Sequence, residues 1–301
     1  MSRRILYVVN PVSGARTRKN LKLLIADETR KAGLEYAIED SVASADYSLL
    51  EKKIKEEGFT DVVIAGGDGT VSQVVAGLMH LPVQFGIIPC GSGNGLALAA
   101  GISKTSEKAL HTVFTGIAKL TDGFRINNHF ACMLSGLGFD AKVAHEFAKN
   151  GSRGLKTYAK EVVKNYLKTK FYQFRIHLQG TEIHTDAFFI SIANSNQFGN
   201  QVTIAPRASL CDGMLDIVIV NRQNKLKLLY QTLKQVMGGN RVQEDDAIDS
   251  RKPVIYFQTS ELIIENLSYA PLHIDGDPAE TADRIEVRVE KQCFKLIYPK
   301  E

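Results

Sequence analysis

A short apolar run ends in a loop of glycines that also carries one carboxylate and one hydroxyl. Residues 62–65 are Val-Val-Ile-Ala, and the loop that follows consists of Gly66, Gly67, Asp68, Gly69 and Thr70. The apolar run predicts a buried parallel strand, and the apolar spacing after Thr70 predicts an amphipathic helix. Glycine amides at the start of a helix suit a phosphate group. Because a carboxylate beside a phosphate requires a cation between them, this loop predicts a metal-bound nucleotide.

Two further loops of small and polar residues follow apolar runs. The first, 10–14, contains Asn10, Ser13 and Gly14, and the second, 91–94, contains Gly91, Ser92 and Asn94. In an open α/β sheet, ligands bind at the carboxyl ends of the strands. Each loop alone could be a tight turn, but three of them together predict a nucleotide site. Two choices stay open: Thr70 binds a phosphate or caps the helix, and Asn94 contacts the nucleotide or forms a left-handed turn.

The elements that must position these loops alternate between strand and helix up to about residue 120. Strands are predicted at 5–9, 36–39, 62–65 and 85–89, with helical patterns between and after them, which indicates a parallel sheet with helices on both faces. After residue 122 the pattern changes to short antiparallel strands, ending with 271–274, 286–289 and 294–298, and helical stretches at 140–149, 155–169 and 225–237 interrupt it. We therefore predict two domains, residues 1–122 and residues 123–301.

Composition indicates an ordinary globular protein. The chain has 301 residues, a formal net charge of +4 and four cysteines without paired spacing, which favours a reduced cytoplasmic setting. No apolar stretch approaches the roughly 20 residues that span a bilayer, so any lipid contact is expected to be peripheral. The mild charge gives no reason to expect nucleic acid. The oligomeric state stays open, and a homodimer is one of the states considered.

Six segments resemble, in order, the motifs of the diacylglycerol kinase catalytic family. They are residues 10–14, 66–70, 91–94, 135–141, 212–216 and 273–278, so the resemblance spans nearly the whole chain. It implies an N-terminal three-layer α/β domain like those of NAD kinase and phosphofructokinase, a C-terminal, mainly antiparallel β-sandwich, and an active-site cleft between them. It also implies ATP, Mg²⁺ and a lipid substrate at the membrane surface, such as diacylglycerol or a sphingoid base.

The resemblance also implies roles for individual residues. The glycines at 66, 67 and 69 would cradle phosphates, and Asp68 would hold Mg²⁺–ATP or orient the acceptor. Asp275 is grouped with the nucleotide-binding residues, although Asp275-Gly276 also predicts a hairpin turn. Asp212 and Asp216 would hold a structural Mg²⁺, or else be turn and strand-edge charges. Asp277 stands where the family usually has glutamate, the proposed base, so it would be the general base or a metal ligand.

Other interpretations stay open. A basic amphipathic segment at 149–170 could lie on an anionic membrane, although a solvated lysine face is the more common meaning of such a pattern. An NAD kinase-like small-molecule kinase shares the glycine loop at 66–70. A non-catalytic lipid- or nucleotide-binding relative is the third alternative, and the aspartate at 277 is the feature that favours it.

Overall fold

The chain folds into two compact units. The computed structural model describes residues 3–11, 18–42, 44–91, 93–142, 145, 170–178, 180–196, 204–223, 248–249 and 251–300. Unit 1 comprises residues 1–123 and 291–301, and unit 2 comprises residues 124–290. The change of pattern at 122 lies next to this division. Residues 291–301, which the sequence analysis assigned to the second domain, belong to unit 1.

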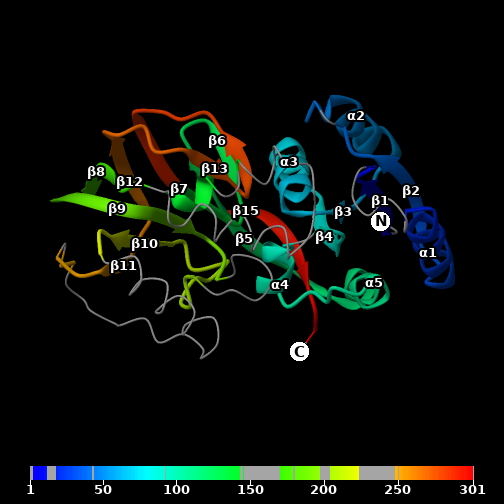
Figure 1. Ribbon diagram of the computed structural model, residues 1–301. Coiled ribbons are helices and arrows are strands. Elements are labelled where there is room, and N and C mark those ends of the chain that lie inside the picture. Colours follow the sequence, from blue (N-terminus) through cyan, green and yellow to red (C-terminus); the bar gives the residue numbers. More distant parts are fainter. Residues whose placement is uncertain are drawn as a thin grey trace. The chain divides into compact units, whose positions relative to one another are not determined.

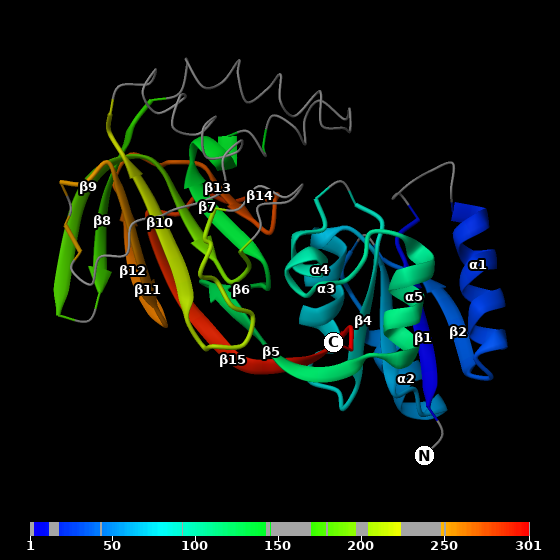
Figure 2. The same cartoon turned by 90° about the horizontal axis from the view of Figure 1, so that it is seen from below.

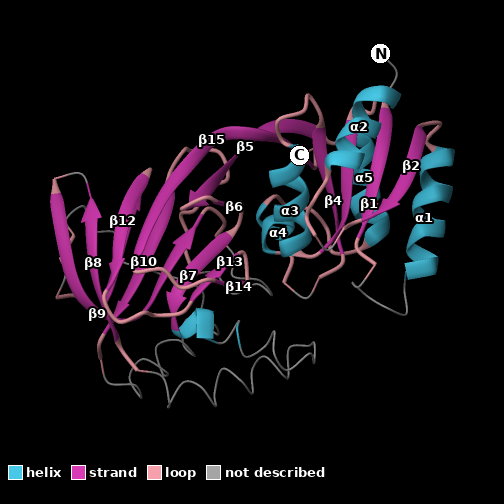
Figure 3. Cartoon of the chain, turned by 90° about the horizontal axis from the view of Figure 1, so that it is seen from above, coloured by secondary structure: helices cyan, strands magenta, loops and turns pink. Residues whose placement is uncertain are grey.

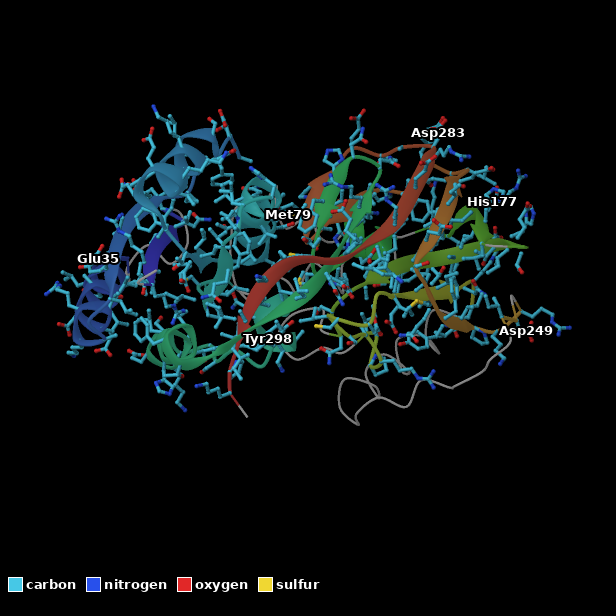
Figure 4. The ribbon with its side chains drawn as sticks, turned by 180° about the vertical axis from the view of Figure 1, so that it is seen from behind. Glu35, Met79, His177, Asp249, Asp283 and Tyr298 are labelled. Atoms are coloured by element: carbon cyan, nitrogen blue, oxygen red, sulfur yellow. The ribbon has the colours of Figure 1, made fainter. Side chains whose placement is uncertain are left out.

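Unit 1 is built on a parallel sheet with the strand order β2–β1–β3–β4. The strands are β1 (Arg4–Val9), β2 (Glu35–Asp40), β3 (Asp61–Gly66) and β4 (Gln84–Pro89). The end of β15 (Arg284–Tyr298) adds a fifth parallel strand, with Lys295 opposite Gln84. Figure 4 labels Tyr298 at the end of this strand. Nearly every residue of β1, β3 and β4 is buried, as expected for strands covered on both faces.

Helices cover both faces of this sheet. The helices are α1 (Arg18–Lys31), α2 (Ser48–Glu57), α3 (Asp68–Leu78), α4 (Gly95–Ala99) and α5 (Ser106–Thr115). In Figure 1, α2 and α3 lie on one side of the strands, and α1 and α5 lie on the other. Helix α3 buries Val71, Val74, Val75 and Leu78, the residues whose spacing predicted it. The three-layer α/β arrangement predicted from the sequence is confirmed.

Unit 2 consists of antiparallel strands in two sheets that share one strand. One sheet contains β5 (Ile117–Ile126), β6 (His129–Ala131), β15, β12 (Glu261–Asn266) and β8 (Tyr172–Leu178). The other contains β14 (Asp277–Ala279), β13 (Leu272–Ile274), β7 (Leu134–Gly138), β10 (Leu215–Asn221) and β11 (Val254–Thr259). Strand β9 (Thr181–Ala193) pairs with β8 through its first half, and with β7 and β10 through its second half (Figure 3).

A single apolar cluster lies between these sheets. It includes Phe174 and Ile264 from one sheet, and Leu137, Ile190 and Ile217 from the other, all at most 1% exposed. Apolar and polar residues alternate along β12 and β15, because one face of each strand packs against this cluster and the other does not. The predicted antiparallel β-sandwich is confirmed.

Two details differ from the sequence analysis or lie outside the described residues. The two strands predicted at 286–289 and 294–298 form the single strand β15. It continues through Gln292, at φ 51°, whose amide donates to the buried carboxylate of Asp122 at 2.6 Å. The predicted helical stretches after residue 140 lie outside the described residues, apart from residues 140–142 and 145. None of the helices in the described ranges is long and apolar enough to cross a membrane.

Candidate functional site

Two of the glycine loops of unit 1 touch each other through their backbones. A Cβ added to Gly91 would lie 2.6 Å from the Cα of Gly67, and one added to Gly67 would lie 3.2 Å from the Cα of Gly91. A Cβ on Gly66 would lie 2.7 Å from the Cβ of Thr70. Glycine is therefore required at these positions for close packing, and not for an unusual φ. The loops after β3 and β4 are brought together as predicted.

Side-chain amides hold these loops in place. The Nδ2 of Asn10 donates to the Thr70 hydroxyl at 2.6 Å, which joins the loop after β1 to the first turn of α3. Asn94 is buried, and its φ of 57° is left-handed. Its side chain accepts from the Gly91 amide at 2.8 Å and donates to the Gly91 carbonyl at 2.7 Å. These contacts agree with the interpretation of Asn94 as a left-handed turn residue.

The first turn of α3 presents backbone amides. Gly67 precedes the helix without a side-chain cap, and the first intrahelical bond runs from the Val71 amide to the Gly67 carbonyl at 3.0 Å. The amides of Gly69 and Thr70 therefore lack intrahelical acceptors, and the helix dipole favours an anion there. The Oδ1 of Asp68 accepts from the Leu96 amide at 3.3 Å. Amides for an anion beside a half-exposed carboxylate for a cation fit a phosphate with a bound divalent metal. Ser13, Gly14 and Ser92 lie outside the described residues.

In unit 2, Asp275 is the centre of a rigid hairpin turn. Strand β13 lies between β14 and β7, and Ile274 pairs with Asp277 across a two-residue loop (Figure 2). Asp275 and Gly276 have φ values of 48° and 87°, which suit a type I′ turn. The Asp275 carboxylate is 5% exposed and accepts three backbone amides, from Cys132 at 2.9 Å, Met133 at 3.0 Å and Leu134 at 2.9 Å. These contacts support the turn interpretation and a positioning role for Asp275, rather than direct contact with a nucleotide.

Asp277 follows this turn on β14, an edge strand. Its side chain is exposed, but the surrounding protein reduces hydration of the carboxyl, which raises its pKa above the ordinary value. The negative charge of Asp275 raises the pKa further. Because the side chain reaches solvent, water limits the size of this effect. A carboxylate with a raised pKa is better suited to accept a proton than an ordinary aspartate.

A buried aspartate–histidine pair lies behind the same turn. The Nε2 of His273 is 3.4 Å from the Oδ2 of Asp140, and both side chains are at most 6% exposed. The Nδ1 of His273 accepts the Gly276 amide at 3.2 Å. Neither residue was predicted to have a role, although both lie inside the motif segments 135–141 and 273–278. Their residue types could have indicated a role, since a histidine beside a carboxylate often has a function in proteins.

Asp212 lies in the turn that leads into β10, and Asp216 lies in that strand. Asp216 is fully buried, and its two oxygens accept from the Tyr256 hydroxyl and from the Gln258 side-chain amide. Burial raises the pKa of Asp216, and the charge of Asp212 adds to that effect. Asp212 is exposed and accepts the Met214 amide at 3.0 Å. In the part of the chain that the structure describes, no three acidic, histidine or cysteine side chains are grouped for a metal. The assignment of Asp212 and Asp216 to a structural Mg²⁺ site stays a prediction.

Comparisons with known proteins cover almost the whole chain. The profile of the "Diacylglycerol kinase catalytic domain" matches residues 4–126, and that of the "YegS C-terminal NAD kinase beta sandwich-like domain" matches residues 134–297. The diacylglycerol kinase of Bacillus subtilis is 26% identical over 284 residues, which cover 91% of this chain and 89% of that protein. A Chromohalobacter salexigens protein named "Probable lipid kinase YegS-like" is 26% identical over 255 residues, 83% of this chain and 79% of that protein.

A solved structure shares the fold. The crystal structure of a diacylglycerol kinase from Bacillus anthracis aligns with a TM-score of 0.73 at 18% identity, covering 98% of this chain and 96% of that one. The two matched ranges correspond approximately to the two units described above. The six motif segments lie within these ranges in the same order along the chain. The chain therefore belongs to the diacylglycerol kinase catalytic-domain family of lipid kinases, with the YegS-type β-sandwich as its second part.

Proposed function

We propose that this protein is an ATP-dependent lipid kinase, which transfers the γ-phosphoryl group of ATP to the hydroxyl of a lipid such as diacylglycerol or a sphingoid base. The observation that carries the proposal is the contact between Gly67 and Gly91 beside the N-terminus of α3. This contact packs two loops into a surface of backbone amides, and Asp68 supplies the only carboxylate within the three glycine-loop segments 10–14, 66–70 and 91–94. Family membership supplies the class of reaction.

Each unit contributes one part of the chemistry. In unit 1, the amides of Gly69 and Thr70 bind phosphate oxygens, and Asp68 would hold a magnesium ion. The chemistry that this ion would supply is positive charge beside the transferred phosphoryl group. In unit 2, Asp277 accepts the proton of the lipid hydroxyl. The hydroxyl oxygen bonds to the γ-phosphorus of ATP as the bond from that phosphorus to the β,γ-bridging oxygen breaks, and ADP leaves. General-base assistance of this kind contributes roughly 10²–10⁴-fold to a rate.

The aspartate at 277 makes the proposal specific to this chain. Its side chain is one methylene shorter than the glutamate that the family usually has. Its raised pKa makes the carboxylate more basic than that of an ordinary aspartate. The turn before it is held by buried contacts, so the shorter side chain is presented from a fixed backbone.

The protein's partner is proposed to be a lipid substrate met at a membrane surface by peripheral contact. The basic segment at 149–170 that motivated this expectation lies outside the described residues, apart from Lys170. Flotation with liposomes containing anionic lipid tests the contact. Binding that weakens with added salt supports a charge-driven contact, and binding that does not change with salt argues against it.

The decisive experiment incubates the protein with radiolabelled ATP, Mg²⁺ and a mixed lipid extract. Labelled lipid supports the proposal. Labelled NADP, formed when NAD is added, would instead indicate an NAD kinase-like enzyme, and the absence of any labelled product would indicate a non-catalytic relative. The Asp68→Ala variant should lose transfer and keep its fold by circular dichroism. The matched control is Asp27→Ala, since Asp27 is exposed on α1 of the same unit and pairs only with Lys31 among the ion pairs of the described residues. Turnover that survives Asp68→Ala would remove Asp68 from the mechanism.

A further inference from the structure

The hairpin that presents Asp277 is held from behind by a chain of buried polar contacts. The Gly276 amide donates to the Nδ1 of His273, and the Nε2 of His273 faces the Oδ2 of Asp140 at 3.4 Å. Both side chains of the pair are almost fully buried. These contacts connect Asp140, near the end of β7, to the residue directly before Asp277.

The contacts fix the tautomer of the imidazole. The Gly276 amide can only donate, so the Nδ1 of His273 must be the unprotonated nitrogen. The proton therefore resides on Nε2 and points toward the carboxylate of Asp140. A histidine protonated on Nδ1 would place two N–H groups against each other and release the turn.

The surrounding backbone leaves a place for the Asp140 carboxylate. Gly136 on β7 pairs directly with His273 on β13, so the two residues face the same side of the sheet. A Cβ at Gly136 would overlap the Oδ2 of Asp140 and would lie 2.8 Å from the Ile190 carbonyl. The other oxygen of Asp140 accepts the Ala141 amide at 2.7 Å, which leaves Oδ2 directed at His273. Glycine at 136 is thus what allows the carboxylate to reach the histidine.

We propose that Asp140 and His273 are positioning residues that fix the Asp275–Gly276 turn, and through it the carboxylate of Asp277, in the orientation that the reaction needs. This inference rests on the proposed function. The Asp275 side chain anchors its own position through the amides of residues 132–134. Strand β14 has three residues and, among the described residues, pairs with β13, so it restrains Asp277 weakly. The contact between His273 and the Gly276 amide therefore restrains the residue directly before Asp277.

The expected effect follows from geometry. A displacement of about 1 Å in a reacting group can reduce a rate by roughly 10²-fold. His273→Phe keeps the volume and removes the polar contacts to Gly276 and Asp140, so we expect kcat to fall about 10–100-fold. The KM for ATP should stay unchanged, because the glycine loops belong to unit 1. His273→Asn places an amide oxygen near the position of Nδ1 and should recover most of the lost kcat.

The matched control is a histidine that contacts the same strand away from the turn. The Nε2 of His145 lies 2.7 Å from the Leu272 carbonyl on β13. His145→Phe removes one hydrogen bond to β13 without touching the Gly276 amide, so kcat should stay close to that of the wild type. An equal loss of kcat in His145→Phe and His273→Phe would show that general support of β13 is the cause, and would overturn the proposal.

A spectroscopic measurement tests the contacts without any turnover. Nitrogen NMR of the protein with ¹⁵N-labelled histidines and glycines should show His273 as the Nε2–H tautomer, assigned by its absence in His273→Phe. The Gly276 amide resonance should shift in His273→Phe and remain near its wild-type position in His273→Asn. An Nδ1–H tautomer, or a Gly276 resonance that does not respond, would overturn the proposal. A wild-type protein without transferase activity would instead refute the proposed function, and an active protein with unchanged kcat in His273→Phe would refute this inference alone.

Discussion

The carboxylate of Asp275 is expected to be a major stabilising group in unit 2. It is 5% exposed and accepts three backbone amides from the turn between β6 and β7. Asp275→Ala would leave three buried amides without their acceptor, and each such group costs about 1–3 kcal/mol. The costs do not add fully because water can enter beside the turn. We therefore expect a loss of about 3–5 kcal/mol in the free energy of unfolding.

Two further substitutions at this position separate the loss of the carboxylate acceptor from the strain of the left-handed backbone. Asp275 has a φ of 48°, a left-handed conformation that costs alanine about 1 kcal/mol and costs glycine almost nothing. Asp275→Gly should therefore be about 1 kcal/mol less destabilising than Asp275→Ala. Asp275→Asn tolerates the left-handed φ and keeps one oxygen for Met133 and Leu134, but its NH₂ group meets the Cys132 amide, at a cost of about 1–3 kcal/mol. The expected order of stability is Asp, Asn, Gly and then Ala.

Urea unfolding followed by circular dichroism gives the free energies, and hydrogen–deuterium exchange gives the local effect. A loss of about 3 kcal/mol corresponds to exchange about 10²-fold faster at the amides of residues 132–134. The control is Asp283→Ala, whose exposed side chain lies on the same unit in the loop before β15 (Figure 4). If Asp275→Ala loses less than about 1 kcal/mol, or if residues 132–134 keep their protection, the reasoning from buried amides is wrong.

Three other predictions concern the loops and the titrating carboxylates. Gly91→Ala should weaken ATP binding more than Gly67→Ala, measured by calorimetry, because its Cβ would lie 2.6 Å rather than 3.2 Å from the facing backbone; equal effects would argue against the loop contact. Asp277→Asn should be inactive and Asp277→Glu active, and kcat should fall as the pH drops through the raised pKa of Asp277, because the base must be ionised; an active Asn variant would exclude a base there. The pKa of Asp216 in the folded protein is raised above its ordinary value of 3.8, so the folded protein binds this proton more tightly than the unfolded chain. The contribution of this group to stability should therefore decrease as the pH rises from the pKa of the unfolded chain to that of the folded protein. Urea unfolding across that range should show a weaker pH dependence in Asp216→Asn, and an unchanged dependence would contradict the raised pKa.

Local patterns predicted much of the fold and the backbone of the candidate site. The apolar runs before residues 10, 66 and 91 predicted the buried strands, because parallel strands covered on both faces need continuous apolar sequence. Asp275-Gly276 predicted a turn because this dipeptide tolerates positive φ at both positions. These features depend on residues that are neighbours in sequence, so their physical cause is visible there.

Contacts between distant residues could not be predicted in this way. Asp275 accepts amides that lie 141–143 residues earlier in the chain, and His273 lies 133 residues after Asp140. Neither pairing follows from local propensity, since it depends on strand register in the folded sheet. The continuity of β15 has a similar origin, because the buried carboxylate of Asp122 holds the amide of Gln292 in the middle of the strand.

The return of β15 to unit 1 has a consequence for how the protein is made. The edge of β4 pairs with residues 295 and 296, more than two hundred positions later in the chain. During synthesis on the ribosome, all of unit 2 must emerge before this edge acquires its partner. Until then, the edge strand of the parallel sheet of unit 1 presents unpaired backbone groups, which can pair with other chains. Folding of unit 1 is therefore expected to be completed only after translation of unit 2, and chaperones that shield strand edges would act in that interval.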